Sequence, residues 1–125
     1  MLVNGLDDYA WRGLSKTLQY TSWPLPAYLR AMRQRFGRYP KHVVALSSSG
    51  PSAFSPGYDF VGISKAVLET LARHLNRMLA KDDVRVNVVR AGLVTTDSLK
   101  DAFGEEFLDF ARRFTGEQQF GVPAM

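Results

Sequence analysis

A tyrosine and a lysine stand near the start of one amphipathic segment, GYDFVGISKAVLETLARHL at positions 57–75. Tyr58 precedes Lys65 by seven residues, which is nearly two turns of an α-helix, so both side chains can project from one face. A free phenol ionises at a pH of about 10, and a neighbouring ammonium makes it a better general acid by stabilising the phenolate. The other interpretation is that both residues are solvated positions on a helix, and the pair alone does not decide.

Two loops place further polar residues near this pair. The segment SSSGPSAFSPG (47–57) follows a valine-rich run at 42–46, and RAGLVTTDS (90–98) follows a second such run at 82–89. Ligands of open parallel sheets bind beyond the carboxyl ends of the strands. We therefore expect the serines, the Tyr58–Lys65 face and the Gly92 loop to converge on one edge of the sheet.

The elements that position these residues follow from hydrophobic periodicity. The continuous apolar run at 42–46 is typical of a strand buried on both faces, as in a parallel sheet. WPLP at 23–26 should interrupt the helical pattern of residues 8–37, and Gly37 should end it. The predicted order is helix, strand, helix, strand, helix, with these bounds: helix 8–37 with its break, strand 42–46, helix 59–80, strand 82–89 and helix 99–114.

This order predicts an α/β fold with parallel strands joined by right-handed crossovers. Two parallel strands cannot form a doubly wound sheet, because the apolar helix faces require more sheet than this chain supplies. We therefore expect residues 1–125 to form part of a single Rossmann-like domain that is incomplete by itself, or one that a partner completes.

Composition and charge limit the classes of protein to which this chain can belong. The chain of 125 residues is 46% hydrophobic and 22% charged, has no cysteine, and contains neither a membrane-spanning run nor a leader peptide, so we expect a cytoplasmic protein. The net charge of +4 comes from scattered basic residues, and no nucleic-acid-binding motif accompanies it. His42 and His74 are isolated in the sequence, so no metal site is expected.

The motifs LSSSG, YDFVGISK and VRVNVVRAGLVTT, taken together, resemble the short-chain dehydrogenase/reductase superfamily. Six residues between tyrosine and lysine are similar to the spacing in bacterial enoyl-acyl-carrier-protein reductases, and the resemblance is strong over residues 43–98. The chain departs from the family in lacking its Gly-rich pyrophosphate turn, because no two of its glycines lie within three residues of each other. The resemblance therefore implies an internal fragment of a reductase, without the N-terminal dinucleotide-binding half.

The resemblance also implies roles for individual residues. Tyr58 would be the catalytic acid, and Lys65 would hold the nicotinamide ribose and assist Tyr58. Ser47 corresponds to the catalytic serine of the superfamily, and Ser48 to a position where many enoyl reductases have a second tyrosine. The loop after the second strand would contact the cofactor through Gly92, Val94, Thr95 and Thr96.

Three hypotheses for function follow. The first is reduction of a conjugated carbon–carbon double bond in an acyl thioester by NADH or NADPH, as in fatty acid synthesis. The second is reduction of a ketone, or oxidation of an alcohol, with Ser47 and Tyr58 on the carbonyl oxygen. The third is a catalytically inactive fragment or an association module. The resemblance further implies a homo-oligomer formed through the two long helices, or a complementing N-terminal half.

Overall fold

The computed structural model describes residues 2–92. The chain divides into two compact units, residues 1–90 and 91–125, and all the described helices and strands belong to the first. The predicted helix at 99–114 lies outside the described residues. None of the helices within 2–92 combines the length and apolar character needed to cross a membrane. The elements are η1 (Leu6–Asp8), α1 (Trp11–Thr21), α2 (Pro24–Phe36), β1 (His42–Ser47), α3 (Asp59–Met78), η2 (Ala80–Asp82) and β2 (Arg85–Arg90).

The predicted helical interruption at WPLP is confirmed, and it separates α1 from α2. Ser22 and Trp23 form the junction, and α2 restarts at Pro24, a first-turn position where the missing proline N–H costs no helical hydrogen bond. Gly37 ends α2 as predicted: it adopts a left-handed conformation with φ 74°, and its N–H donates to the Arg33 carbonyl at 2.8 Å.

The two strands pair in parallel, in a register that runs from His42 beside Arg85 to Ser47 beside Arg90. β2 begins later than predicted, because residues 80–82 form a short 3-10 turn and Asp83 takes a left-handed conformation with φ 58°. The parallel pairing confirms the predicted crossover through α3.

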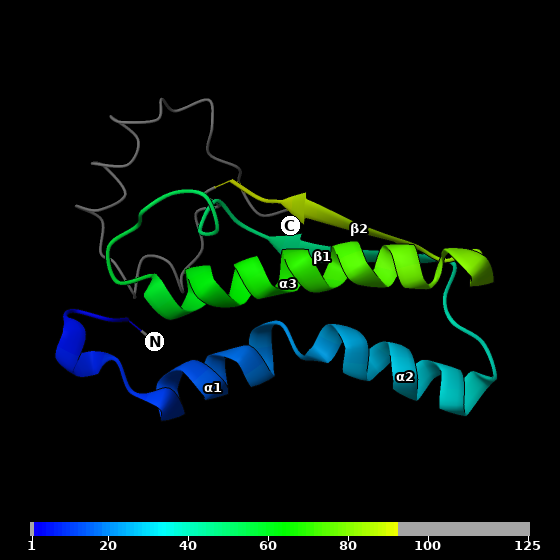
Figure 1. The fold of residues 1–125 in the computed structure, drawn as a ribbon, viewed down its shortest axis with the longest axis horizontal. Coiled ribbons are helices and arrows are strands. Elements are labelled where there is room, and N and C mark those ends of the chain that lie inside the picture. Colours follow the sequence, from blue (N-terminus) through cyan, green and yellow to red (C-terminus); the bar gives the residue numbers. More distant parts are fainter. Residues whose placement is uncertain (1, 93–125) are drawn as a thin grey trace, which may run out of the picture. The chain divides into compact units, whose positions relative to one another are not determined.

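The helix α3 covers one face of this two-stranded sheet, and α1 and α2 follow one another along the other side of α3 (Figure 1). Alternation along each strand directs Val43 and Ala45 of β1, and Val86 and Val88 of β2, toward the helical side. A hydrophobic core forms there around Leu29, Ala72, Leu79, Val84 and Val86. The core therefore joins α2, the end of α3 and the sheet.

The opposite face of the sheet is exposed. Val44, Leu46 and Val89 are 60%, 63% and 50% exposed. The prediction that the first strand is buried on both faces is therefore wrong for the described part of the chain, because α3 covers only one face of a sheet of two strands. The apolar composition of the strand does fit a sheet with more cover, and the predicted incompleteness of the sheet is confirmed.

Candidate functional site

Tyr58 lies at the N-terminus of α3, beside the carboxyl ends of the two strands. α3 runs antiparallel to both strands, so its first turn and the ends of β1 and β2 share one edge of the fold (Figure 1). Tyr58 is the N-cap residue, with φ −96° and ψ 15°, and its carbonyl accepts the Gly62 N–H at 2.7 Å. Its half-buried side chain therefore leaves the backbone where the loop becomes a helix.

Lys65 reaches from α3 to the end of β1. Its Nζ donates a hydrogen bond to the Leu46 carbonyl oxygen at 2.8 Å. Partial burial lowers the pKa of the Lys65 ammonium below its ordinary value, because desolvation disfavours the charged form. The fold thus holds a partly desolvated cation at the carboxyl edge of the sheet.

Tyr58 also lines a pocket of ≈ 280 Å³, together with Tyr9, Phe54 and Ile63 among others. The Tyr9 hydroxyl donates to the Asp59 carboxylate, and its ring meets the Phe60 ring edge-on with centroids 5.3 Å apart. The hydrogen bond to Asp59 is the main cause that raises the pKa of Tyr9. Of the predicted site residues within 2–92, Tyr58 lines this pocket, whereas Ser47, Ser48, Lys65 and Gly92 are not among its lining residues.

The loop that leads to Tyr58 approaches α3 very closely at one point. A Cβ added to Gly50 would lie 3.0 Å from the Gly62 Cα, and one added to Gly62 would lie 3.2 Å from the Gly50 carbonyl oxygen. Only glycine at both positions allows backbone to meet backbone at this separation. This contact fixes how closely the loop at 47–57 packs against the first turns of α3.

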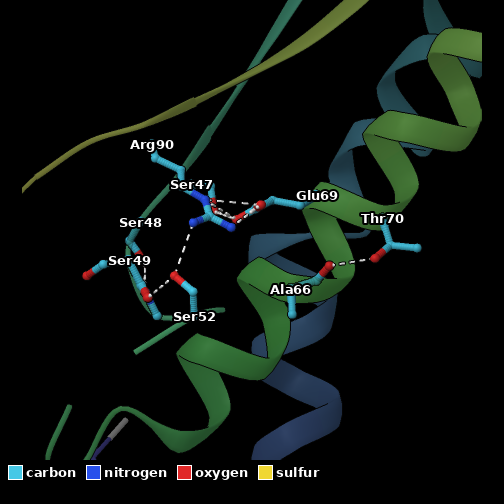
Figure 2. A network of polar contacts seen from close by, with 9 residues as sticks. Ser47, Ser48, Ser49, Ser52, Ala66, Glu69, Thr70 and Arg90 are labelled. Carbon is cyan, nitrogen blue, oxygen red and sulfur yellow. Dashed lines mark hydrogen bonds and ion pairs between the residues drawn. The ribbon is translucent and has the colours of Figure 1, made fainter. Parts of the chain in front are cut away.

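Ser47 takes part in a polar network at the end of β1 (Figure 2). It is buried, and its Oγ donates to Glu69 Oε2 at 2.6 Å. The Arg90 guanidinium binds the same carboxylate, with Nη2 to Oε1 at 2.8 Å and Nε to the two oxygens at 3.2 and 3.1 Å. The network links the ends of both strands to the middle of α3.

Arg90 extends the network to the loop, because its Nη1 donates to Ser52 Oγ at 3.1 Å. The bonds from Arg90, followed by the one from Ser47, lower the pKa of Glu69. The Arg90 side chain is 47% exposed, and exposed ion pairs contribute little to stability. The main effect of the network is therefore to position the ends of the two strands and the loop relative to α3, rather than to stabilise the fold.

Sequence reasoning missed four residues of this region: Tyr9, Ser52, Glu69 and Arg90. Strand ends offered a signal for Arg90, since the parallel register places it beside Ser47. Glu69 lies one helical turn after Lys65, on the face that meets β1, so helical spacing could also have indicated it. Tyr9 carries no local signal, because its partner Asp59 lies 50 residues away.

The remaining predicted residues are less connected. Ser48 is half-buried, and its Oγ accepts the Gly50 N–H at 3.1 Å. Gly92 is exposed and is the last described residue. Val94, Thr95 and Thr96 lie outside the described residues. Within residues 2–92 no three metal-ligating side chains gather at one place.

These features define an α/β protein with a tyrosine and a partly desolvated lysine at the carboxyl edge of a parallel sheet. Residues 3–121 match the family model described as enoyl-(acyl carrier protein) reductase. This match covers most of the chain, and the chain therefore belongs to that family.

Individual relatives agree with the match. The chain is 30% identical over 91 residues to the enoyl-acyl-carrier-protein reductase (NADH) FabI of Neisseria meningitidis serogroup B, a match that covers 73% of this chain and 35% of the relative. It is 30% identical over 92 residues to the enzyme of that name from Aquifex aeolicus, covering 74% and 34%. The chain thus matches only about a third of the length of these relatives.

The fold is similar to a solved structure, the FabI–NADH complex from Alistipes finegoldii. The TM-score is 0.74 at 24% sequence identity, and the similarity covers 88% of this chain and 40% of that one. At this identity the likeness establishes the Rossmann-like fold of the described region.

Proposed function

We propose that this chain forms the proton-donating part of an NAD(P)H-dependent enoyl-acyl-carrier-protein reductase, which reduces a conjugated carbon–carbon double bond in an acyl thioester. The observation that carries the proposal is the placement of Tyr58 and Lys65 at the carboxyl edge of a parallel sheet, in a chain of this family. We further propose that residues 1–125 belong to a single reductase domain. The relatives' names favour NADH over NADPH.

The residues at this edge fit the nicotinamide–ribose end of such a cofactor. The Lys65 ammonium lies 2.8 Å from the Leu46 carbonyl oxygen, and an ammonium has three donors, so it can hold this contact and still donate to ribose hydroxyls. When bound, the nicotinamide supplies a hydride. The Gly-rich turn that receives a pyrophosphate has no counterpart in the sequence, so the fit concerns the nicotinamide–ribose end alone.

In this proposal Tyr58 donates its phenolic proton to the thioester carbonyl oxygen of the substrate, as the negative charge of the enolate develops there. Lys65 stabilises the resulting phenolate electrostatically, since it is a cation on the same helix and partly removed from water. The apolar walls of the Tyr58 pocket, which include Phe54 and Ile63, suit the hydrocarbon part of a substrate. Ser47 acts indirectly, because its hydroxyl donates to Glu69 within the protein.

A carbonyl reductase is the second candidate, and one observation favours it. The Ser48 oxygen accepts a backbone N–H, which leaves its hydroxyl proton to find an acceptor such as a substrate carbonyl. Comparing turnover of a crotonyl thioester with that of an acetoacetyl thioester separates the two chemistries. Preferential turnover of the acetoacetyl thioester would contradict the enoyl reductase proposal.

The first test is a titration of NADH and NADPH into the purified chain, followed by nicotinamide fluorescence. We expect saturable binding that Lys65→Ala abolishes and that Lys81→Ala, an exposed lysine in η2, leaves unchanged. Equal loss in both variants would indicate a general effect of charge. No binding at millimolar cofactor would contradict the proposal for this chain acting alone, and would favour an inactive fragment or an association module.

A second test separates proton donation from binding. Tyr58→Phe should lower turnover by roughly 10²–10⁴-fold, because general acid catalysis contributes about that factor, while the Kd for NADH stays the same. Tyr28→Phe changes an exposed tyrosine on α2 and serves as the matched control. Unchanged turnover in Tyr58→Phe would remove Tyr58 from the catalytic role.

We also propose that this protein associates with further copies of itself or with a complementing half. Large aromatic side chains on α1 and α2 and at their junction are exposed, and the sheet leaves one apolar face uncovered, which supports an association surface. The exposed aromatic residues are Trp11, Tyr20, Trp23, Tyr28 and Phe36. Light scattering on the purified chain checks this, and a monomer over the whole micromolar range would contradict self-association.

A further inference from the structure

Lys65 and Glu69 carry opposite charges one helical turn apart on α3, yet they bind different partners. Residues at i and i+4 are neighbours on a helix surface and can form an ion pair. In the structure the Lys65 Nζ instead donates to the Leu46 carbonyl oxygen, and the Glu69 carboxylate binds Ser47 and Arg90. Some feature of the fold must keep the carboxylate from pairing with Lys65, a cation one turn before it on the same helix.

The hydrogen bonds that the Glu69 carboxylate accepts from Arg90 and Ser47 supply that feature. An ionised carboxylate offers about four acceptor positions. The single Nε–H of Arg90 is shared between the two oxygens, the Arg90 Nη2 donates to Oε1, and Ser47 donates to Oε2, at distances from 2.6 to 3.2 Å (Figure 2). These three donors occupy most of the acceptor positions of the carboxylate, and the Lys65 Nζ is bound to the Leu46 carbonyl oxygen instead.

Arg90 is itself held in place by contacts beyond Glu69. It ends β2, its Nη1 donates to Ser52 Oγ, and Ser52 in turn bonds the Ser49 carbonyl through both its N–H at 3.0 Å and its Oγ at 3.4 Å. A strand end and a loop therefore both fix the guanidinium. Arg73, one turn further along α3, is the other cation whose charge lowers the pKa of Glu69.

We propose that Arg90 is a positioning residue that holds the Glu69 carboxylate away from Lys65, so that the Lys65 ammonium stays at the carboxyl edge of the sheet for the cofactor and Tyr58. Without Arg90 the carboxylate would lose its strongest partner, and Lys65 would compete with Arg73 to replace it. The role in catalysis rests on the proposed function, whereas the geometry of the ion pair does not.

The test is the pKa of the Lys65 ammonium, followed by the pH dependence of its side-chain NMR signal in the full chain without cofactor. In Arg90→Met we expect this pKa to rise, because the released carboxylate favours the charged lysine. Removing any nearby positive charge also raises a lysine pKa. The pKa is therefore measured in a cycle of four proteins: the wild type, Arg90→Met, Glu69→Gln, and the double variant.

The cycle separates the two causes. A rise on removing Arg90 that is clearly larger when Glu69 is present than in the Glu69→Gln background supports the proposal. An equal rise in both backgrounds, or no rise in either, overturns it. Should Arg90→Met fail to fold, as judged by its thermal melt, Arg90→Gln repeats the cycle with a neutral side chain that can still bond Ser52.

The experiment needs neither cofactor nor substrate, so failure of the reductase proposal leaves its result intact. If the chain does bind NADH, Arg90→Met should weaken that binding several-fold, and adding Glu69→Gln should restore part of the loss. Restoration by a second substitution is a result that a merely structural role of Arg90 does not produce. Weakening of equal size in the single and double variants would contradict the role toward the cofactor.

Discussion

The N-terminal part of α3, residues 59–69, and its C-terminal part, residues 70–78, contact the rest of the molecule in different ways. The N-terminal part meets the sheet through hydrogen bonds of Lys65 and Glu69, and meets the loop through the contact of Gly62 with Gly50. The C-terminal part places Ala72 in an apolar core with α2 and β2. The N-terminal part therefore combines the polar contacts of the candidate site with the buried side chains of Phe60 and Leu68, whereas the C-terminal part joins the core shared with α2 and β2.

The magnitudes of these forces suggest a division of labour. Burying a leucine side chain stabilises a fold by about 1.5–3 kcal/mol, whereas a hydrogen bond contributes about 0.5–1.5 kcal/mol net. Hydrophobic burial has no direction, so the C-terminal part of α3 anchors the helix without specifying side-chain angles. The polar contacts of the N-terminal part add little stability but set the geometry of the candidate site, while Phe60 and Leu68 supply hydrophobic burial there.

The largest expected effect tests the apolar core that α2 forms with the C-terminal part of α3 and with β2. Leu29→Ala should lower the free energy of unfolding by about 2–5 kcal/mol, because it opens a cavity where α2 meets α3 and β2. Urea denaturation measures the change. Met32→Ala, on the same helix but 42% exposed, is the control and should cost much less. Similar losses in the two variants would show that the core is not where the helix is anchored.

A smaller effect tests the backbone contact between Gly50 in the loop and Gly62 in the N-terminal part of α3. Gly50→Ala places a Cβ 3.0 Å from the Gly62 Cα, so the loop must shift, at a cost of about 1–3 kcal/mol. Thermal unfolding gives the stability, and amide hydrogen exchange reports whether residues 50–58 lose protection. Gly5→Ala is the matched control, since a Cβ there meets nothing within 4 Å. Unchanged protection of residues 50–58 in Gly50→Ala would mean that this contact does not set the distance between the loop and α3.

The smallest effect concerns the Glu69 carboxylate and pH. Arg90 and Ser47 hold the pKa of Glu69 below its ordinary value of 4.5, so the unfolded chain binds more protons there and the folded state loses stability as pH falls through the folded pKa. Glu69→Gln should therefore flatten the decline in stability below a pH of about 4.5, measured by thermal unfolding at several pH values. Asp7→Asn, which changes an exposed carboxylate in η1, is the matched control. An identical decline in wild type and Glu69→Gln would show that the network adds no linkage to pH.

Much of the fold could be predicted from local patterns. The valine-rich runs, the prolines at the α1–α2 junction and Gly37 each act within a few residues, and all four elements that they define occur in the structure. The exposed face of β1 was not predicted, because the sequence of an apolar strand does not indicate whether a second layer covers it. The network around Arg90 was not predicted either, since it joins side chains 21 and 38 residues apart in sequence.

The sequence by itself determined the order of the elements, the parallel pairing, the need for more sheet than this chain supplies, and the placement of Tyr58 and Lys65 at the carboxyl edge of the sheet. Only the tertiary structure decided that Ser47 binds Glu69, that Arg90 pairs with that carboxylate, and that Tyr9 joins Tyr58 at one pocket. The physical reason is range. Periodicity and turn chemistry are encoded between near neighbours, whereas hydrogen bonds between distant side chains depend on how closely the packed helices and strands approach.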